Sequence, residues 1–139
     1  MRVVADTNVT LSGLLWLGNP GLVLEAAAEG RSALCTSPAL VQDLSETLQS
    51  PKLAARIQAS GLTLDELLQR YLDVVVLTEP KSVQRVVPDD PEDDQVIAAA
   101  IAAQADLIVS GDKHLLDLES HLGIRIVPPA EAVRMIAGA

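Results

Sequence analysis

The sequence predicts an α/β fold, a three-layer α/β/α sandwich in which a central parallel sheet lies between two layers of helices. Short apolar segments rich in Val, Ile and Leu alternate along the chain with longer segments of helical periodicity. This alternation is typical of parallel strands connected by helices. The chain is 49% hydrophobic but contains one Trp, one Tyr and no Phe. Aliphatic side chains must therefore form the core, as in most buried parallel sheets.

The first part of the chain predicts one strand and two helices. Residues 2–5 form an apolar strand, and a helix is expected over 9–16. The Gly-Asn-Pro-Gly segment at 18–21 is expected to end that helix, because Gly and Pro commonly interrupt helices. A second helix is expected over 22–29, with Gly30 after it, where glycine readily adopts the left-handed conformation of a helix end.

The next segment predicts a strand at 33–36 and a helix that begins at Ser37 and Pro38. Serine is a favoured N-cap residue, and proline is favoured in the first turn of a helix. An apolar stripe follows at fourfold spacing, as expected for a helix with one face on the core. The stripe consists of Leu40, Leu44 and Leu48.

Further helices are expected over 52–59 and from Thr63, which has the spacing of a capping box with Glu66. Residues 73–77 are Val-rich and predict a buried strand. The remaining elements are, in order, an acidic loop at 89–94, an Ala-rich helix over 95–104, a strand at 106–110, a turn at 111–113, a strand at 124–127 and a closing helix over 129–136.

Length and composition indicate one domain in a reducing compartment. The 139 residues contain no repeat or linker, so we expect a single domain over 1–139. No signal-type segment follows Met1, and no apolar stretch approaches the ~20 residues that span a bilayer. The lone Cys35 excludes an intramolecular disulfide. We expect a soluble cytoplasmic protein without a membrane partner.

The net charge of −9 argues against a general basic surface for nucleic acid. It does not exclude a nuclease whose acidic residues are gathered at a metal site. It also leaves room for a basic protein partner.

Two acidic residues directly follow predicted strands. Asp6 follows the first strand and Asp112 follows the strand at 106–110. In parallel sheets, functional sites gather beyond the carboxyl ends of the strands. Each acid alone has an ordinary structural explanation, as a helix cap or a turn residue. Two carboxylates at one edge repel each other, however, and this pattern usually indicates a bound cation.

At two further places the sequence offers two neighbouring acids, and either one could belong to the site. In the acidic run, Asp93 has the helical spacing of Ile97, whereas Asp94 has the spacing of Ala98, so either could face inward. In the helix after Pro38, Asp43 lies at the margin of the apolar stripe, and Glu46 lies three residues later.

Carboxylates of this kind favour Mg²⁺ or Mn²⁺ over zinc, since the two His and one Cys show no ligand spacing. One or two such ions can promote the attack of water on a phosphodiester. Hydrogen bonds to the metal ligands are expected from Thr7, Asn8 and Ser110.

An ordered set of motifs resembles the PIN-domain family, and within it the toxins of type II toxin–antitoxin systems (VapC-like ribonucleases). The motifs are Asp6-Thr7-Asn8-Val9, Thr36-Ser37-Pro38, Ser50-Pro51-Lys52, Asp90-Pro91-Glu92-Asp93-Asp94 and the segment from Ala105 to Leu116. The resemblance implies a PIN-like nuclease domain, RNA cleavage with Mg²⁺ or Mn²⁺, a homodimer and a cognate antitoxin protein.

Residue by residue, the resemblance places catalytic acids at Asp6, Asp93 and Asp112, which are also the expected metal ligands. Relatives usually carry Glu at the position of Asp43, so Asp43 is the expected fourth catalytic acid and Glu46 its alternate. Asp94 is the alternate to Asp93.

Other classes fit less well. A receiver domain needs a phosphoacceptor Asp after the middle strand, where this chain has Leu77-Thr78-Glu79. A phosphatase with an Asp-x-Asp nucleophile pair is excluded, because Asn8 occupies the position of the second Asp. A PIN-like module that binds a protein or RNA without cleaving it remains the alternative, favoured by Asp43 and by the acidic total.

Overall fold

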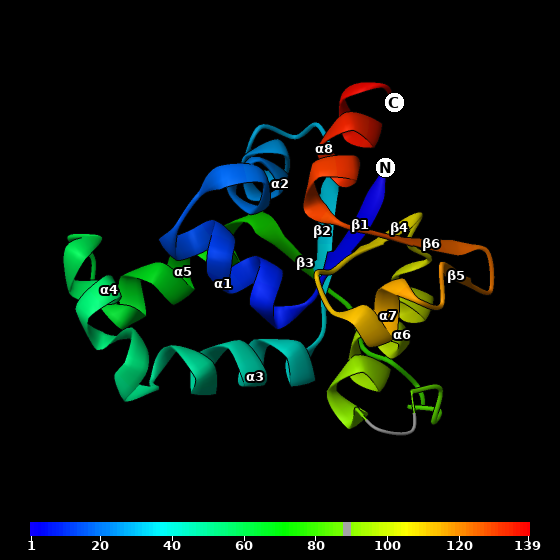
Figure 1. Cartoon of the computed structure of the whole chain (residues 1–139), viewed down its shortest axis with the longest axis horizontal. Helices are drawn as coiled ribbons and strands as arrows, with labels where there is room; N and C mark the ends of the chain where they lie inside the picture. The colour runs from blue at the N-terminus through cyan, green and yellow to red at the C-terminus, as the bar shows by residue number, and fades with distance from the viewer. Residues whose placement is uncertain (88–89) are drawn as a thin grey trace.

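The computed structural model describes residues 1–87 and 90–139. Within this part of the chain, one sheet runs in the order β3-β2-β1-β4-β6-β5 (Figure 1). The first five strands of this order are parallel, and β5 is antiparallel to β6. The strands are β1 Arg2–Ala5, β2 Ala33–Thr36, β3 Val75–Leu77, β4 Leu107–Val109, β5 Ser120–His121 and β6 Ile124–Val127. The predicted central parallel sheet is confirmed.

Helices cover both faces of the sheet, which confirms the predicted three layers (Figure 1). The helices are α1 Thr7–Leu15, α2 Gly18–Ala28, α3 Pro38–Leu48, α4 Ala54–Ala59, α5 Leu64–Val74, α6 Pro91–Ala103, α7 Lys113–Leu116 and α8 Pro129–Ala137, with a 3₁₀ turn, η1, at Pro51–Leu53. None of the described helices is long and apolar enough to cross a membrane.

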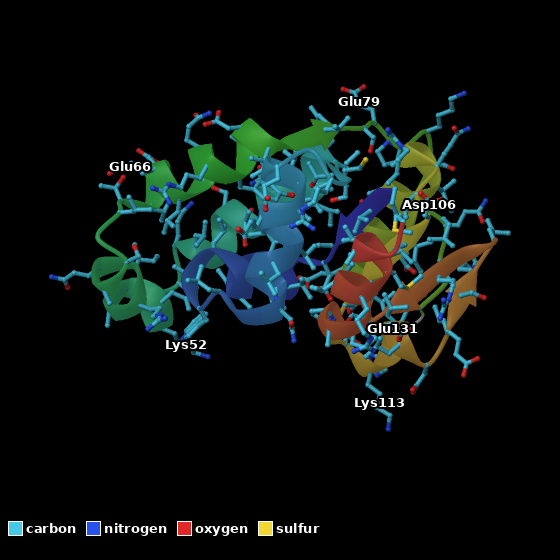
Figure 2. All side chains as sticks on the ribbon, turned by 90° about the horizontal axis from the view of Figure 1, so that it is seen from above. Lys52, Glu66, Glu79, Asp106, Lys113 and Glu131 are labelled. Carbon is cyan, nitrogen blue, oxygen red and sulfur yellow. The ribbon has the colours of Figure 1, made fainter. Side chains whose placement is uncertain are left out.

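The core consists of two aliphatic clusters, one on each face of the sheet. Successive strand residues point to opposite faces, so Val3 packs in one cluster and Val4 in the other. The first cluster is shared with α1, α2, α3, α5 and α8. The second is formed mainly with α6, whose alanines allow the helix to lie close to the sheet. Charged residues such as Lys52, Glu66 and Lys113 lie at the periphery (Figure 2).

The first two helices begin earlier than predicted. α1 begins at Thr7 because Asp6 caps it, accepting a hydrogen bond from the Val9 N–H. α2 begins at Gly18, so the segment 18–21 forms its first turn and does not lie between the helices. A proline is tolerated there because the first N–H groups of a helix have no partner within it.

The predicted buried strand at 73–77 is partly wrong. α5 continues through Val74, and β3 contains only Val75–Leu77. Val76 and Leu77 are exposed by 43% and 56%. The reason is the position of the strand in the fold: in the described part of the chain, β3 lies at the edge of the sheet and pairs only with β2.

The acidic run also differs from its prediction as a loop. α6 begins at Pro91, so Glu92, Asp93 and Asp94 lie in its first helical turn. Proline at this position favours the helix start, and acids there favour the positive end of the helix dipole. Asp89 of the predicted loop lies outside the described residues.

Two elements near the C-terminus were not predicted. The expected turn at 111–113 leads into the short helix α7, and the short strand β5 forms the antiparallel edge of the sheet. Asp112 caps α7 by accepting a hydrogen bond from the His114 N–H at 2.7 Å.

Candidate active site

An acidic pocket of about 180 Å³ lies beyond the carboxyl ends of β1 and β4. Residues from the starts of α1 and α6, the second half of α3 and the segment between β4 and α7 surround it. They are Asp6, Thr7, Asn8, Asp43, Thr47, Asp90, Glu92, Asp93, Val96 and Asp112. All four acids that the sequence ranked first therefore lie on one pocket.

Asp6 is buried at the base of this pocket, with 5% of its surface exposed. One carboxylate oxygen accepts a hydrogen bond from the Val9 N–H at 2.8 Å, and the other accepts one from the Ser110 hydroxyl. Burial raises the pKa of Asp6, its two hydrogen bonds partly lower it, and the charge of Asp112 adds to the rise. The carboxylate is thus fixed in direction but poorly solvated.

Ser110 connects the acids of the first and fourth strands. It is fully buried. Its hydroxyl donates to Asp6 and accepts a hydrogen bond from the Asp112 N–H at 2.9 Å. A single side chain therefore sets the relative position of Asp6 and the backbone of Asp112.

Asp93 and Asp94 are both buried, but the fold places them differently. Asp93 lines the pocket, whereas Asp94 does not. One oxygen of Asp94 accepts two backbone hydrogen bonds, from the Val86 and Val87 N–H groups at 2.8 and 2.7 Å. Asp94 therefore holds the segment before α6 in place.

The Asp93 carboxylate has an unusual electrostatic environment. Its Oδ2 atom is buried and has no hydrogen-bond partner among the described residues. Burial raises the pKa of Asp93 to about 7, and the charges of Asp112, Asp90 and Asp6 contribute to the rise. Among the described residues, no ion pair balances the charge of an ionised Asp93.

The two candidate acids of α3 are also separated. Asp43 lines the pocket, and its Oδ2 accepts a hydrogen bond from the Thr7 hydroxyl at 2.5 Å. Glu46 is exposed, does not line the pocket and accepts a hydrogen bond from the Gln42 side chain. Three polar residues were expected to hydrogen-bond the metal ligands. Ser110 donates a hydrogen bond to Asp6, Thr7 donates one to Asp43, and Asn8 lines the pocket.

Sequence reasoning missed three residues at the pocket or its rim: Asp90, Glu92 and His114. Asp90 precedes α6 by one residue and lies three residues before Asp93, a spacing that could have indicated a shared side. Glu92 lines the pocket, and its pKa is raised first by the charge of Asp43 and then by its own burial.

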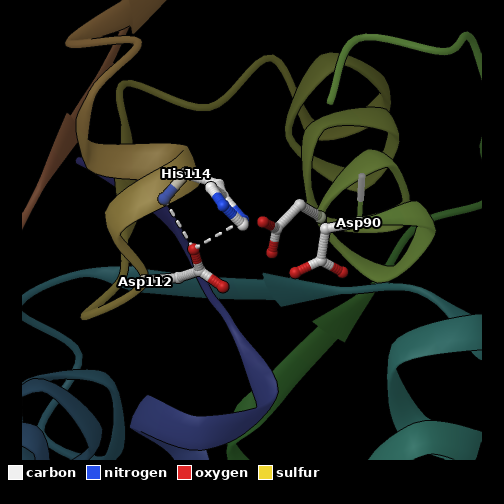
Figure 3. Close-up of side chains that lie close together, drawn as sticks. Asp90, Asp112 and His114 are labelled. Carbon is white, nitrogen blue, oxygen red and sulfur yellow. Dashed lines mark hydrogen bonds and ion pairs between the residues drawn. The ribbon is translucent and has the colours of Figure 1, made fainter. Parts of the chain in front are cut away.

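His114 lies at the rim together with Asp112, which it follows by two residues. Its ring and the Asp90 and Asp112 carboxylates lie close together (Figure 3). No pattern in the sequence distinguishes it from a solvated turn histidine. Lys113, between the two, points outward from the body of the protein (Figure 2).

The donor set fits a hard divalent cation. Carboxylate oxygens predominate, as Mg²⁺ and Mn²⁺ prefer. In the described part of the chain, no Lys or Arg forms an ion pair with Asp6, Asp43, Asp93 or Asp112. A cation would satisfy the unpartnered Asp93 oxygen and offset the repulsion among these acids.

Comparisons with known proteins point to one family and one fold. The family model described as PIN domain matches residues 2–114. No curated protein matches the chain. Among solved structures, the chain is similar to the crystal structure of VapBC2 from Rickettsia felis bound to a DNA fragment from their promoter, with a TM-score of 0.64 and 13% identity, over 91% of this chain and 97% of that chain. This structural likeness supports the fold described above.

Proposed function

The chain belongs to the PIN-domain family, and from this premise we propose that it is a metal-dependent endoribonuclease that hydrolyses RNA phosphodiester bonds. The observation that carries the proposal is the unpartnered, buried oxygen of Asp93 in a pocket lined by further carboxylates. Burial of an unpaired carboxylate is costly. A pocket built at that cost is best explained by a cation that the carboxylates bind.

Asp6, Asp93 and Asp112 would hold one or two Mg²⁺ or Mn²⁺ ions, directly or through water. When bound, such an ion supplies positive charge for the phosphate and lowers the pKa of water. Ser110 holds the Asp6 carboxylate in one orientation, and the same hydroxyl fixes the start of the segment that carries Asp112. Such outer hydrogen bonds keep ligands in place before the cation arrives.

Asp43 would orient the attacking water or contribute to a second ion. Its hydrogen bond from Thr7 directs one oxygen toward the start of α1, at the edge of the pocket. The exposed position of Glu46 makes it the weaker candidate for this role.

We also propose that the chain is the toxin of a toxin–antitoxin pair, acting as a homodimer that a cognate antitoxin inhibits. The fold likeness to the Rickettsia felis VapBC2 structure supports this proposal. The net charge of −9 suits a partner with basic segments. Co-expression with the product of a small adjacent reading frame should restore growth that the chain alone arrests, and should yield a stable complex.

The activity is tested by incubating the purified chain with a mixed RNA pool and Mg²⁺, Mn²⁺ or a chelator. We expect cleavage that the chelator abolishes. Asp6→Asn should lose activity by roughly 100-fold or more, because even groups that only orient metal ligands contribute 10- to 100-fold. An asparagine can still cap α1. Without metal, this variant should be as stable as the wild type or more so, because one repelling charge is removed.

Asp93→Asn and Asp94→Asn form a matched pair. The first should abolish cleavage, whereas the second keeps an oxygen that can accept from Val86 and Val87 and should retain activity. The proposed nuclease activity would be refuted if a folded sample, free of antitoxin, showed no metal-dependent cleavage. Wild-type activity in Asp6→Asn would refute the assigned site, and greater damage from Asp94→Asn would reverse the order of the two acids.

The alternative function is a PIN-like module that binds RNA or protein without cleaving it. The shorter acid at position 43 and the net charge of −9 favour it. The same experiment separates the two functions, since the alternative predicts RNA binding or partner capture with intact RNA under every metal condition.

A further inference from the structure

We infer that His114 contributes an imidazole nitrogen to the metal site, and that the site therefore prefers Mn²⁺ to Mg²⁺. This inference rests on the proposed function, with which the group shares the ligands Asp93 and Asp112, and it specifies which cation the site selects. It concerns a residue that neither the sequence pattern nor the family match singles out.

The geometry brings His114 within reach of the same ion as three carboxylates. One ligand atom each from Asp90, Asp93, Asp112 and His114 lies within 4.8 Å of the others. Ligands on opposite sides of one ion with bonds of roughly 2.1 Å stand about 4.2 Å apart. The separations in the group are therefore close to those of ligands around a single ion, and His114, the most exposed of the four, is the freest to rotate toward it.

The starts of two helices present these residues to each other. Asp90 and Asp93 stand at the start of α6, and Asp112 and His114 at the start of α7. The Asp112 carboxylate accepts the His114 backbone N–H at 2.7 Å, and the same oxygen lies 3.8 Å from the ring Nδ1 atom. The helix cap that shapes α7 therefore also keeps the imidazole beside the acids (Figure 3).

A second observation indicates that this group is a ligand site and not an ordinary acidic surface. Asp93 is 5% exposed, and its Oδ2 atom has no hydrogen-bond partner among the described residues. A buried carboxylate oxygen normally has a partner. A cation held between α6 and α7 would supply one.

The donor set determines the choice of cation. Mg²⁺ strongly prefers oxygen ligands and keeps several waters, so an imidazole adds little to its binding. Mn²⁺ shares the preference of Mg²⁺ for carboxylates, but it is a first-row transition metal and therefore also binds nitrogen donors such as imidazole. With His114 in the group, the site gains a ligand that stabilises Mn²⁺ selectively.

Electron spin-echo spectroscopy of the full chain with Mn²⁺ alone tests the contact directly. The wild type should show ¹⁴N modulation from a bound imidazole. His114→Gln should lose this modulation, and His121→Gln should retain it, because His121 on β5 is not part of the group. His114 is exposed, so its substitution leaves the core intact.

Titrations give the selectivity independently of activity. Mn²⁺ affinity, measured from the signal of the free ion, should fall about 10-fold in His114→Gln. Mg²⁺ affinity, measured by competition, should change little. The ratio of the two affinities should be unchanged in His121→Gln.

The outcomes separate this inference from the proposed function. Mn²⁺ binding that Asp93→Asn abolishes, without ¹⁴N modulation in the wild type, overturns the role of His114 but keeps the metal site. The role of His114 is also overturned if the ¹⁴N modulation persists in His114→Gln, or if the ratio of the Mn²⁺ and Mg²⁺ affinities is unchanged in that variant. Failure of the wild type to bind Mn²⁺ overturns both the inference and the proposed metal site.

Discussion

At the scale of single residues, the pocket concentrates negative charge, and no Lys or Arg among the described residues forms an ion pair with its four candidate catalytic acids. The pKa of Asp93 shows this most clearly, because burial and the charges of three neighbouring carboxylates all raise it. Ser110 and Thr7 donate hydrogen bonds to Asp6 and Asp43, but hydroxyl groups carry no positive charge. These hydrogen bonds therefore fix the positions of the two carboxylates without neutralising their charge.

The raised pKa of Asp93 predicts how stability depends on pH in the absence of metal. Its pKa is about 7 in the folded chain, against 3.8 for an ordinary Asp. Between these values the folded state holds a proton that the unfolded state has lost. The contribution to the free energy of unfolding is therefore full below about pH 4 and is lost as pH rises toward 7. Urea unfolding at several pH values, with a chelator present, measures this slope.

Asp93→Asn is the control for that measurement, because the amide does not titrate. The decline in stability with pH should be smaller in this variant than in the wild type. Equal slopes would show that Asp93 titrates normally in the folded chain.

The two acids of α3 give a second prediction. Asp43→Ala should lower the cleavage rate at saturating metal by roughly 10- to 100-fold, as expected when a group that orients a ligand or water is lost. Glu46→Ala should remain close to wild type, because Glu46 is exposed and bonds only Gln42 among the described residues. If Glu46→Ala is the more damaging, the assignment of Asp43 is wrong.

At the scale of elements, the close contact between α1 and α2 supports the helix that begins at the pocket. Gly13 of α1 lies directly against α2. A Cβ atom at Gly13 would stand 2.7 Å from Leu24 Cδ1 and 2.8 Å from the Pro20 carbonyl oxygen. The absence of a side chain at this position therefore permits the two helices to pack.

Gly13→Ala should destabilise the chain by about 1–3 kcal/mol, the usual cost of overpacking. In an open helix the same change would stabilise by roughly 0.5–1 kcal/mol, so the sign of the effect tests the contact. Urea unfolding measures it. Gly138→Ala is the comparison, because the nearest atom there is the Arg134 carbonyl oxygen at 3.5 Å, an ordinary contact. A Gly13→Ala variant as stable as the wild type would contradict this packing.

At the scale of the whole molecule, 19 acidic residues outnumber 10 basic ones. Several of the basic residues are engaged locally: Arg31 pairs with Glu29, and Arg125 pairs with Glu131. The acids of the pocket add to the general excess of negative charge. Self-repulsion of this kind lowers the stability of a compact state.

Monovalent salt should therefore raise the melting temperature of the metal-free chain. The physical reason is screening, which is substantial at 0.1 M, where the Debye length is about 10 Å. With saturating Mg²⁺ or Mn²⁺ the increase should be smaller, because the bound cation already offsets part of the repulsion. Thermal unfolding at increasing salt, with and without divalent metal, measures the difference. A melting temperature that falls with salt in the chelated sample would contradict the prediction.

The sequence by itself determined the parallel sheet and the edge at which its acids meet. The bounds of β1, β2 and β6 were predicted correctly, since short aliphatic runs between polar residues indicate strands, and the Thr63 capping box forms as expected. Asp6 and Asp112 were placed by one rule, that residues following parallel strands share an edge.

Only the tertiary structure decided which neighbours reach the pocket. Asp93 and Asp94 are adjacent in α6, and periodicity left both open. The segment at Val86 and Val87 binds Asp94, whereas the Oδ2 atom of Asp93 has no hydrogen-bond partner among the described residues. Asp90 and His114 are brought together by the approach of α6 and α7, a contact between distant segments that no local pattern records. Local chemistry selects helices and strands, whereas a site assembled from their ends depends on how the whole chain packs.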